Sequence, residues 1–134
     1  MNQFTSSNPK SSGDLKTNND CMIRAVANIT GNAYRDVHAI MYQLGWRAVR
    51  RNSKGNWQYQ ILKTLDELGF KATYESFPAI KGESRICGYT FNKSGKWILR
   101  MAKHISAYID GVLVDSWDCR YKCVYFAWKI EPKN

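Results

Sequence analysis

The fold of this chain is decided by residues 103–117, which read KHISAYIDGVLVDSW. An Asp-Gly dipeptide at positions 110–111 separates two runs that are rich in β-branched and aromatic residues. Such a dipeptide between apolar runs favours a two-residue type I′ turn, because both central positions of that turn need a positive φ. We therefore predict an antiparallel hairpin that pairs a strand at 104–109 with a strand at 112–117.

The register of this hairpin brings a histidine close to a carboxylate. If Ile109 lies opposite Val112, then Ser106 lies opposite Asp115. His104 is then the diagonal neighbour of Asp115 on the same face of the sheet, at a separation that an imidazole–carboxylate hydrogen bond can span. A carboxylate in that position fixes the tautomer of the imidazole and leaves its other nitrogen facing a nucleophile. His104 and Asp115 are therefore candidate catalytic residues.

The candidate nucleophile is Cys21, which begins a short helix that is apolar on most of its faces. Gly31 ends this helix, and Asp20 or Asn19 is the candidate cap at its start. Free N–H groups and the positive end of the helix dipole stabilise a thiolate at the first helical position, and a nearby imidazolium lowers its pKa further. A cysteine on an apolar helix is otherwise more often a core residue.

The remaining elements predict the fold class. Two further helices are expected at about 33–44 and 56–68, with Asn32 and Asn56 as candidate caps. Period-two patterns then predict additional strands at 70–74, 97–101 and 124–130. The order indicates an α+β fold, in which N-terminal helices pack on a C-terminal antiparallel β-sheet.

Length and composition predict one domain with an N-terminal arm. The chain has 134 residues, which suffices for one hydrophobic core but not for two. Residues 1–18 are rich in Ser, Asn, Lys and Gly and carry few apolar side chains, a composition typical of a flexible arm. We therefore expect a single domain over residues 19–134.

The charge of the chain bears on its partners. There are 20 Lys and Arg residues against 11 Asp and Glu residues, so the net charge is +9. Such a surface attracts nucleic acid or an acidic protein, although the basic residues are spread along the chain and no nucleic-acid motif accompanies them. No signal peptide is legible, and no apolar run approaches the roughly 20 residues that span a bilayer. We therefore expect a cytoplasmic protein that does not contact a membrane.

Three other cysteines, Cys87, Cys119 and Cys123, are expected to be structural. Thiols stay reduced in the cytoplasm, so disulfides are not predicted. The spacing of Cys119 and Cys123 suits a metal ligand pair, but a second pair of ligands is not evident nearby in the sequence. We therefore predict no metal and no other cofactor.

Two segments resemble a known superfamily. An Asn- and Asp-rich turn that runs into the Cys21 helix, together with the much later His104 and Asp115 strands, resembles the papain-like cysteine peptidases. The match is most similar to their compact bacterial and phage branch, the bacteriocin-leader-processing peptidase-like domains. The segments that carry it are 18–25 and 103–117. The tripeptide 115–117, Asp-Ser-Trp, is similar to the Asn-Ser-Trp of papain itself.

The resemblance implies a papain-like fold and a role for each site residue. Cys21 would be the nucleophile, His104 the general base and then acid, and Asp115 the residue that orients the histidine. Trp117 would shield the hydrogen bond between His104 and Asp115 from water.

The oxyanion donor departs from the family pattern. The family usually places a Gln a few residues before the cysteine, whereas this chain has Leu15 and Lys16 in that region. Asn19 or Asn18 is the candidate replacement, together with the backbone N–H of Cys21, because a developing oxyanion needs two donors.

These expectations favour a cysteine peptidase or related thiol hydrolase. Such an enzyme cleaves an amide, isopeptide or thioester bond through an acyl-enzyme on Cys21, and the basic surface suits an acidic protein or peptide substrate. Peptidase, deamidase and acyl-transferase chemistry use the same three residues and stay open. The alternative is a non-enzymatic basic module that keeps this scaffold and binds nucleic acid or an acidic protein.

Overall fold

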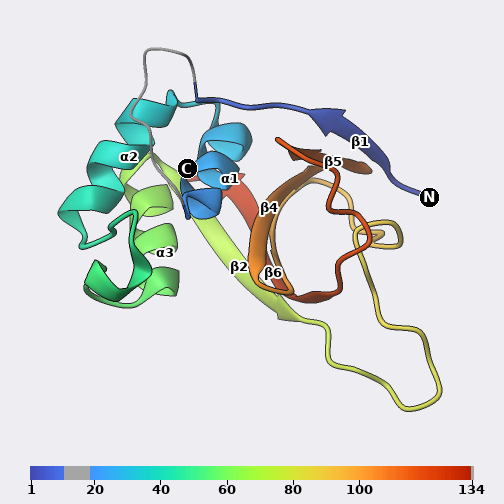
Figure 1. Ribbon diagram of the computed structural model, residues 1–134. Helices are drawn as coiled ribbons and strands as arrows, with labels where there is room; N and C mark the ends of the chain where they lie inside the picture. The colour runs from blue at the N-terminus through green and yellow to red at the C-terminus, as the bar shows by residue number, and fades with distance from the viewer. Residues whose placement is uncertain (11–18, 134) are drawn as a thin grey trace.

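A computed structural model describes residues 1–10 and 19–133 of the chain. Three α-helices stand between a short first strand and five later strands within this part of the chain (Figure 1). The helices are α1 (Cys21–Thr30), α2 (Tyr34–Gln43) and α3 (Trp57–Glu67), and a 3₁₀ turn, η1, spans Arg50–Asn52. The strands are β1 (Gln3–Ser6), β2 (Phe70–Ser76), β3 (Lys96–Met101), β4 (His104–Ile109), β5 (Val112–Asp115) and β6 (Val124–Pro132).

The strands form one sheet in the order β1-β5-β4-β3-β6-β2. Every neighbouring pair is antiparallel except β1 and β5, which run parallel. The three helices gather on one side of the sheet (Figure 1), which confirms the predicted α+β class. The predicted elements begin and end within two residues of the observed ones.

Apolar side chains cover both faces of the sheet. On the helical side, Ile23 and Val26 of α1 pack in one buried cluster with Ile105 of β4. On the other side, Tyr108 and Leu113 belong to a second cluster, which also takes in side chains from the segments between strands. Full burial of one such side chain contributes roughly 1.5–3 kcal/mol. The first cluster therefore fixes α1 against β4, where the candidate residues lie, and the second cluster packs on the other face of β4.

The predicted hairpin is confirmed in turn and register. Asp110 and Gly111 have φ values of 43° and 85°, as a type I′ turn requires, and Ile109 pairs with Val112. Strand β5 ends at Asp115, two residues earlier than predicted. The carboxylate of Asp115 accepts a hydrogen bond of 2.6 Å from the backbone N–H of the next residue, and such local bonds compete with strand pairing.

The N-terminal residues differ from the expected arm. Residues 3–6 form β1, which pairs with β5 so that Ser6 lies beside Asp115. The backbone N–H of Ser7 donates to the carbonyl of Asp115 at 2.8 Å. Phe4 packs against the second apolar cluster, so one aromatic anchor and a row of backbone bonds hold a segment whose composition is mostly polar. Residues 11–18, the remainder of the predicted arm, lie outside the described part.

The helix starts follow two different patterns. Asn56 caps α3 as predicted, because its side chain accepts from the N–H groups of Gln58 and Tyr59. Asp20 precedes α1, but its side chain makes no capping bond. Its carboxylate instead accepts a bond of 2.7 Å from the hydroxyl of Tyr34. The candidate cap at Asp20 is therefore corrected: the side chain ties α1 to α2.

The longest helix in the part of the chain that the structure describes has 11 residues, and none there could cross a bilayer.

Candidate active site

Cys21 is the first residue of α1 and lies at the edge of the helical core. Its side chain is half-buried and contributes to the wall of a pocket. The first N–H groups of a helix have no partner within the helix, and they carry the positive end of its dipole. The fold therefore places a reachable thiol where a thiolate is stabilised.

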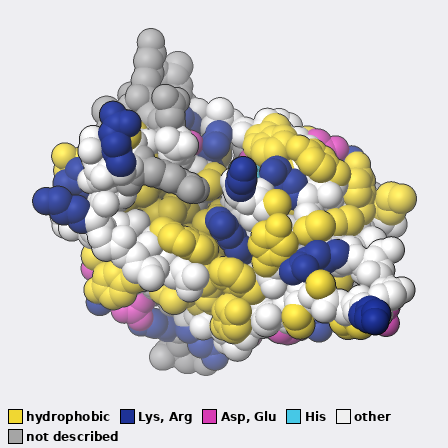
Figure 2. All heavy atoms as spheres, turned by 60° about the horizontal axis from the view of Figure 1, so that its bottom comes forward, with side chains coloured by type: hydrophobic (Ala, Val, Ile, Leu, Met, Phe, Trp, Pro, Cys, Tyr) yellow, Lys and Arg dark blue, Asp and Glu magenta, His cyan; other side chains and the backbone are white. Residues whose placement is uncertain are grey.

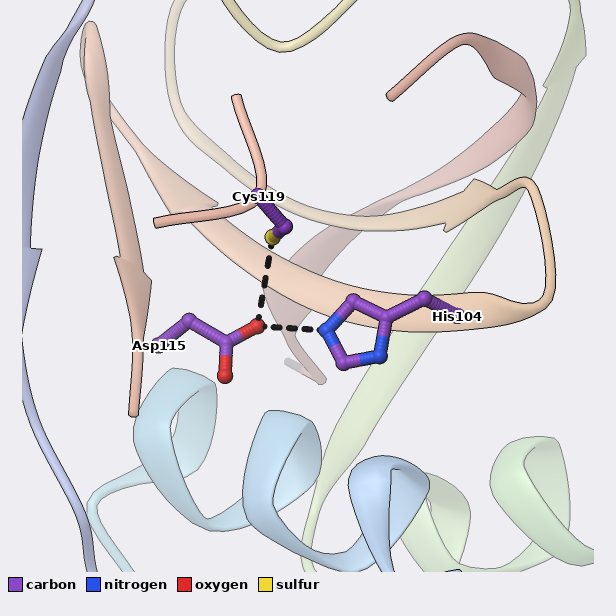
Figure 3. A group of neighbouring side chains, drawn as sticks. All are labelled: His104, Asp115 and Cys119. Carbon is purple, nitrogen blue, oxygen red and sulfur yellow. Dashed lines mark hydrogen bonds and ion pairs between the residues drawn. The ribbon is translucent and has the colours of Figure 1, made fainter. Parts of the chain in front are cut away.

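His104 and Asp115 are joined as the hairpin register predicts. The Nε2 of His104 donates to the Oδ2 of Asp115 at 2.7 Å, and both residues are buried, with exposed fractions of 7% and 5%. The hydroxyl of Ser106 donates to the same oxygen at 2.6 Å. Figure 3 shows the His104 ring edge-on to the carboxylate, with the dashed line marking their bond.

The second ring nitrogen of His104 faces Cys21. Because Nε2 is bound to Asp115, Nδ1 is the nitrogen left for another partner. It is directed away from the carboxylate and toward the helix ribbon with the colour of α1 (Figure 3). The side chains of His104 and Cys21 each act on the pKa of the other. The structure therefore joins the imidazole of His104 to the carboxylate of Asp115, and the thiol of Cys21 is near enough to affect the pKa of His104.

The electrostatics of the three groups favour a charged pair. Burial alone raises the pKa of the Cys21 thiol, but the hydrogen bond and charge of His104, the backbone of Ile105 and the charge of Arg24 outweigh it, so the pKa falls below 9.0. Burial lowers the pKa of His104, while hydrogen bonds to Asp115, Cys119 and Cys21 raise it to about 11. At neutral pH this balance favours thiolate beside imidazolium.

The pKa of Asp115 is lowered as well. Burial raises it, but the hydrogen bonds from His104 and Ser106 and the charge of the imidazolium lower it further than burial raises it. The carboxylate is therefore ionised at neutral pH, where the histidine is charged.

Arg24 supports the site and was not singled out from the sequence. Its guanidinium forms an ion pair of 3.2 Å with Asp20 and donates to the hydroxyl of Ser116 at 3.0 Å. It thus connects the start of α1 to the residue after Asp115. Its position three residues after Cys21 places it on the same side of the helix, and that spacing is the signal that could have indicated it.

Cys119 is a second thiol beside the carboxylate. Its sulfur lies 3.5 Å from the Oδ2 of Asp115 and 3.7 Å from the hydroxyl of Ser106. Its exposed fraction is 0%, so a substrate carbonyl has no access to it. Between Cys21 and Cys119, only Cys21 is placed to act as a nucleophile.

The same neighbourhood offers a set of metal-ligating atoms. One atom each from His104, Asp115 and Cys119 lies within 4.8 Å of the others. All three residues are buried. Asp115 already accepts hydrogen bonds from the side chains of His104 and Cys119. A metal ion here would take the place of the hydrogen bond between Nε2 of His104 and Asp115, which orients the ring.

Of the predicted shielding and oxyanion residues, Trp117 and Asn19 lie near the candidate catalytic residues. The ring of Trp117 lies 5.1 Å from that of His104, centroid to centroid, and is 38% exposed. Asn19 lines the same pocket as Cys21, but its amide nitrogen donates to the carbonyl of Ala48 at 2.9 Å. That bond uses one of its two N–H groups. Asn18, the other candidate oxyanion donor, lies outside the described residues.

Comparison with solved structures finds a similar backbone. The chain is similar to a double-glycine-motif protease from an AMS/PCAT transporter, whose crystal structure was determined in complex with the leader peptide. The sequence identity is 12% and the TM-score 0.49, over 92% of this chain and 89% of the other. No protein-family model and no curated protein matches the sequence. The likeness concerns the arrangement of the backbone, so the chemistry of this chain is argued from its own residues.

Proposed function

We propose that this chain is a papain-like thiol hydrolase that cleaves an amide, isopeptide or thioester bond in a peptide or protein. The observation that carries the proposal is the chain of contacts from Asp115 through His104 to a reachable Cys21. A nucleophile, a base in contact with it and a group that orients the base are the parts that covalent acyl transfer requires.

The first chemical step forms an acyl-enzyme. The thiolate of Cys21 attacks the carbonyl carbon, and the π electrons of the carbonyl move to its oxygen. When the tetrahedral intermediate collapses, the bond to the leaving group breaks, and the His104 imidazolium donates its Nδ1 proton to that group. Asp115 holds the ring through Nε2 during both events, so Nδ1 stays directed at the reacting atoms.

The second step releases the acyl group. Neutral His104 takes a proton from water, whose oxygen attacks the thioester carbonyl, and the thiolate leaves. Each step develops negative charge on the carbonyl oxygen, and each well-placed donor contributes about 10²–10³ in rate. The backbone N–H of Cys21 and the side chain of Asn19 are the candidate donors, and Trp117 is the candidate shield over the ring of His104.

The thiol can be tested without knowledge of the substrate. Alkylation by iodoacetamide, followed by peptide mapping, gives the rate at each of the four cysteines as a function of pH. We expect Cys21 to react fastest, with an apparent pKa below 9.0, because the thiolate is the nucleophile. Equal, slow reaction of all four cysteines would contradict the proposal.

Two controls separate activation by His104 from simple exposure. In His104→Gln, Cys21 keeps its position but loses the imidazolium, so its apparent pKa should rise. Addition of EDTA to the unmodified chain should leave the rate at Cys21 unchanged, because the hydrogen bonds among His104, Asp115 and Cys119 need no metal. A large change on chelation would instead support a metal site at those residues.

A binding module is the second candidate function. The chain carries a net charge of +9, and Figure 2 shows a face on which Lys and Arg side chains lie among hydrophobic ones. Nucleic acid binds such surfaces with a strong dependence on salt. A mobility shift of RNA or DNA that weakens steeply between low and physiological salt, with an unreactive Cys21, would favour this function over catalysis.

A further inference from the structure

A small pocket adjoins Cys21 and is rich in positive charge. Its volume is about 220 Å³, below the roughly 300–1,000 Å³ of sites for drug-sized ligands, so it suits one side chain of a peptide. Trp46 and Trp57 supply apolar walls, and Arg47 and Arg100 supply two guanidinium groups. Its described lining residues include neither Asp nor Glu.

The two arginines differ in how they are held. Arg47 donates to the backbone carbonyls of Trp46 and Tyr42 at 2.7 and 2.9 Å and stacks on the ring of Tyr42. Arg100 stacks on the ring of Trp57, with 5.0 Å between the guanidinium carbon and the ring centroid. Within the described part of the chain, Arg100 has neither a carboxylate partner nor a hydrogen-bond acceptor.

Arg100 also lies close to the reacting atoms. In the sheet register it pairs with Ile105, the residue after His104. Ile105, Arg100 and Cys21 line the same pocket. A group bound by Arg100 would therefore belong to the residue at the scissile carbonyl or to its immediate neighbour.

We propose that this pocket recognises an acidic side chain, Asp or Glu, next to the bond that Cys21 attacks; this inference rests on the proposed function. The guanidinium nitrogens of Arg100 are not buried and have no partner among the described residues, so they are available to a ligand. The planar group matches a carboxylate with two parallel hydrogen bonds. Trp57 holds the guanidinium in place before the substrate arrives, so little side-chain entropy is lost on binding.

Two reagents of nearly equal size test the pocket directly. Iodoacetate carries a carboxylate, whereas iodoacetamide carries the neutral amide. We expect Arg100→Gln to lower the ratio of iodoacetate to iodoacetamide rates at Cys21 about tenfold. The matched control is Arg85→Gln, because Arg85 also stacks on an aromatic ring, Tyr125 at 4.7 Å, but does not line the pocket. This control should leave the ratio unchanged.

Peptide probes extend the test to a side chain. Acetyl dipeptidyl chloromethyl ketones are prepared with Glu or Gln at either position and Gly at the other. At one of the two positions, Glu should be preferred about tenfold over Gln, and Arg100→Gln should remove the preference. Fast labelling of Cys21 with equal rates for Glu and Gln overturns the inference alone. Slow labelling by every probe, iodoacetamide included, overturns the proposed function as well.

A second inference concerns Cys87 and Cys123, which the site does not use. Their backbones pair as an isolated antiparallel β-bridge. The flanking hydrogen bonds run from Gly88 N–H to Lys122 carbonyl and from Val124 N–H to Ile86 carbonyl, so the two cysteines are a pair without hydrogen bonds between them. Facing Cα atoms in such a pair are about 4.5 Å apart, inside the range of about 4.4–6.8 Å for disulfides. Both are free and half-buried.

We infer that Cys87 and Cys123 form a reversible disulfide when a small-molecule disulfide is present. One thiolate attacks the small disulfide, which releases one small thiol and leaves a mixed disulfide on the protein. The second cysteine then attacks the protein sulfur and releases the other small thiol. The two protein thiols are oxidised, and the small disulfide is reduced. The bond would join the segment before β3 to the segment that carries Trp117 and Cys119.

Mass spectrometry tests this site. After treatment with oxidised glutathione, the Cys21→Ser chain should lose about 2 Da, and digestion should yield one linked peptide pair that contains Cys87 and Cys123. Adding Cys119→Ser to the Cys21→Ser chain should leave the disulfide intact. Adding Cys87→Ser instead should stop the reaction at a glutathione adduct. Stable glutathione adducts on both residues without a bridge, or a bridge to Cys119, would overturn the inference.

Discussion

Asp115 is the residue on which the candidate site converges. Its Oδ2 accepts from His104, Ser106 and Cys119, and its Oδ1 accepts from the backbone of Ser116. A buried carboxylate with that many donors stays ionised, because each bond favours the charged form. The carboxylate therefore both orients the imidazole and keeps it protonated.

Replacing Asp115 by Asn separates these two roles. The amide oxygen can still accept from His104, but the negative charge is gone, so the pKa of His104 should fall from about 11. The imidazole then loses its proton at lower pH, and the thiolate loses its charge partner. The apparent pKa of Cys21, measured by iodoacetamide alkylation, should consequently rise. An unchanged alkylation profile in Asp115→Asn would show that the charge of Asp115 does not affect the pKa of the Cys21 thiol.

Asp115→Ala provides the matched comparison. It removes the acceptor altogether and leaves the buried donors of His104 and Ser106 without partners, at about 1–3 kcal/mol for each donor. Denaturant unfolding should therefore show a much larger loss of stability in Asp115→Ala than in Asp115→Asn.

At the scale of elements, the β4–β5 hairpin aligns His104 with Asp115. The turn at Asp110 and Gly111 has positive φ at both positions, and the pairing of Ile109 with Val112 follows from it. On the far side, β1 pairs with β5 and covers what would otherwise be an edge of the sheet. The hairpin is thus held by its own turn and by neighbours on both sides.

Gly111→Ala tests how the turn contributes. A Cβ at this position would meet its nearest heavy atom at 4.0 Å, so the cost is backbone strain at φ 85°, about 1 kcal/mol. We expect urea unfolding to show a loss of that size, while the apparent pKa of Cys21 stays unchanged because the neighbouring strands preserve the register. No loss of stability would argue against a type I′ turn, and a shifted pKa would show that the turn alone sets the register.

Local elements could be predicted from the sequence, whereas distant pairings could not. The hairpin and the cap at Asn56 depend on neighbouring residues, so their signals lie within a few positions. The pairing of β1 with β5 and the place of β6 between β2 and β3 join segments far apart, and side-chain periodicity says nothing about partners. The same limit applies to Cys21 and His104: periodicity placed each on its element, and only the resemblance suggested that they meet.

At the scale of the whole molecule, the site lies where the helical layer meets the sheet. Strand β4 is buried on both faces, by the α1 cluster on one side and by the Tyr108 cluster on the other. The helix that carries Cys21 and the strand that carries His104 are therefore held by core packing rather than by the contact between the two side chains. Core packing holds α1 and β4 in place without the charged pair of Cys21 and His104. The contribution of the pair can therefore be measured as the pH-dependent part of the free energy of unfolding.

The sign of that contribution follows from the pKa shifts. The pKa of Cys21 is lowered from 9.0, so its contribution is full above 9.0 and is lost as pH falls through the folded-state value. Cys21→Ser removes the charge with little change in shape. The difference in free energy of unfolding between the unmodified chain and Cys21→Ser, from urea titrations, should therefore grow from pH 5 to pH 9. Cys123→Ser is the control, because this free thiol lies outside the pocket and away from His104 and Asp115, and its difference should not follow the same curve. A flat difference for Cys21→Ser would mean that the thiol stays neutral beside His104.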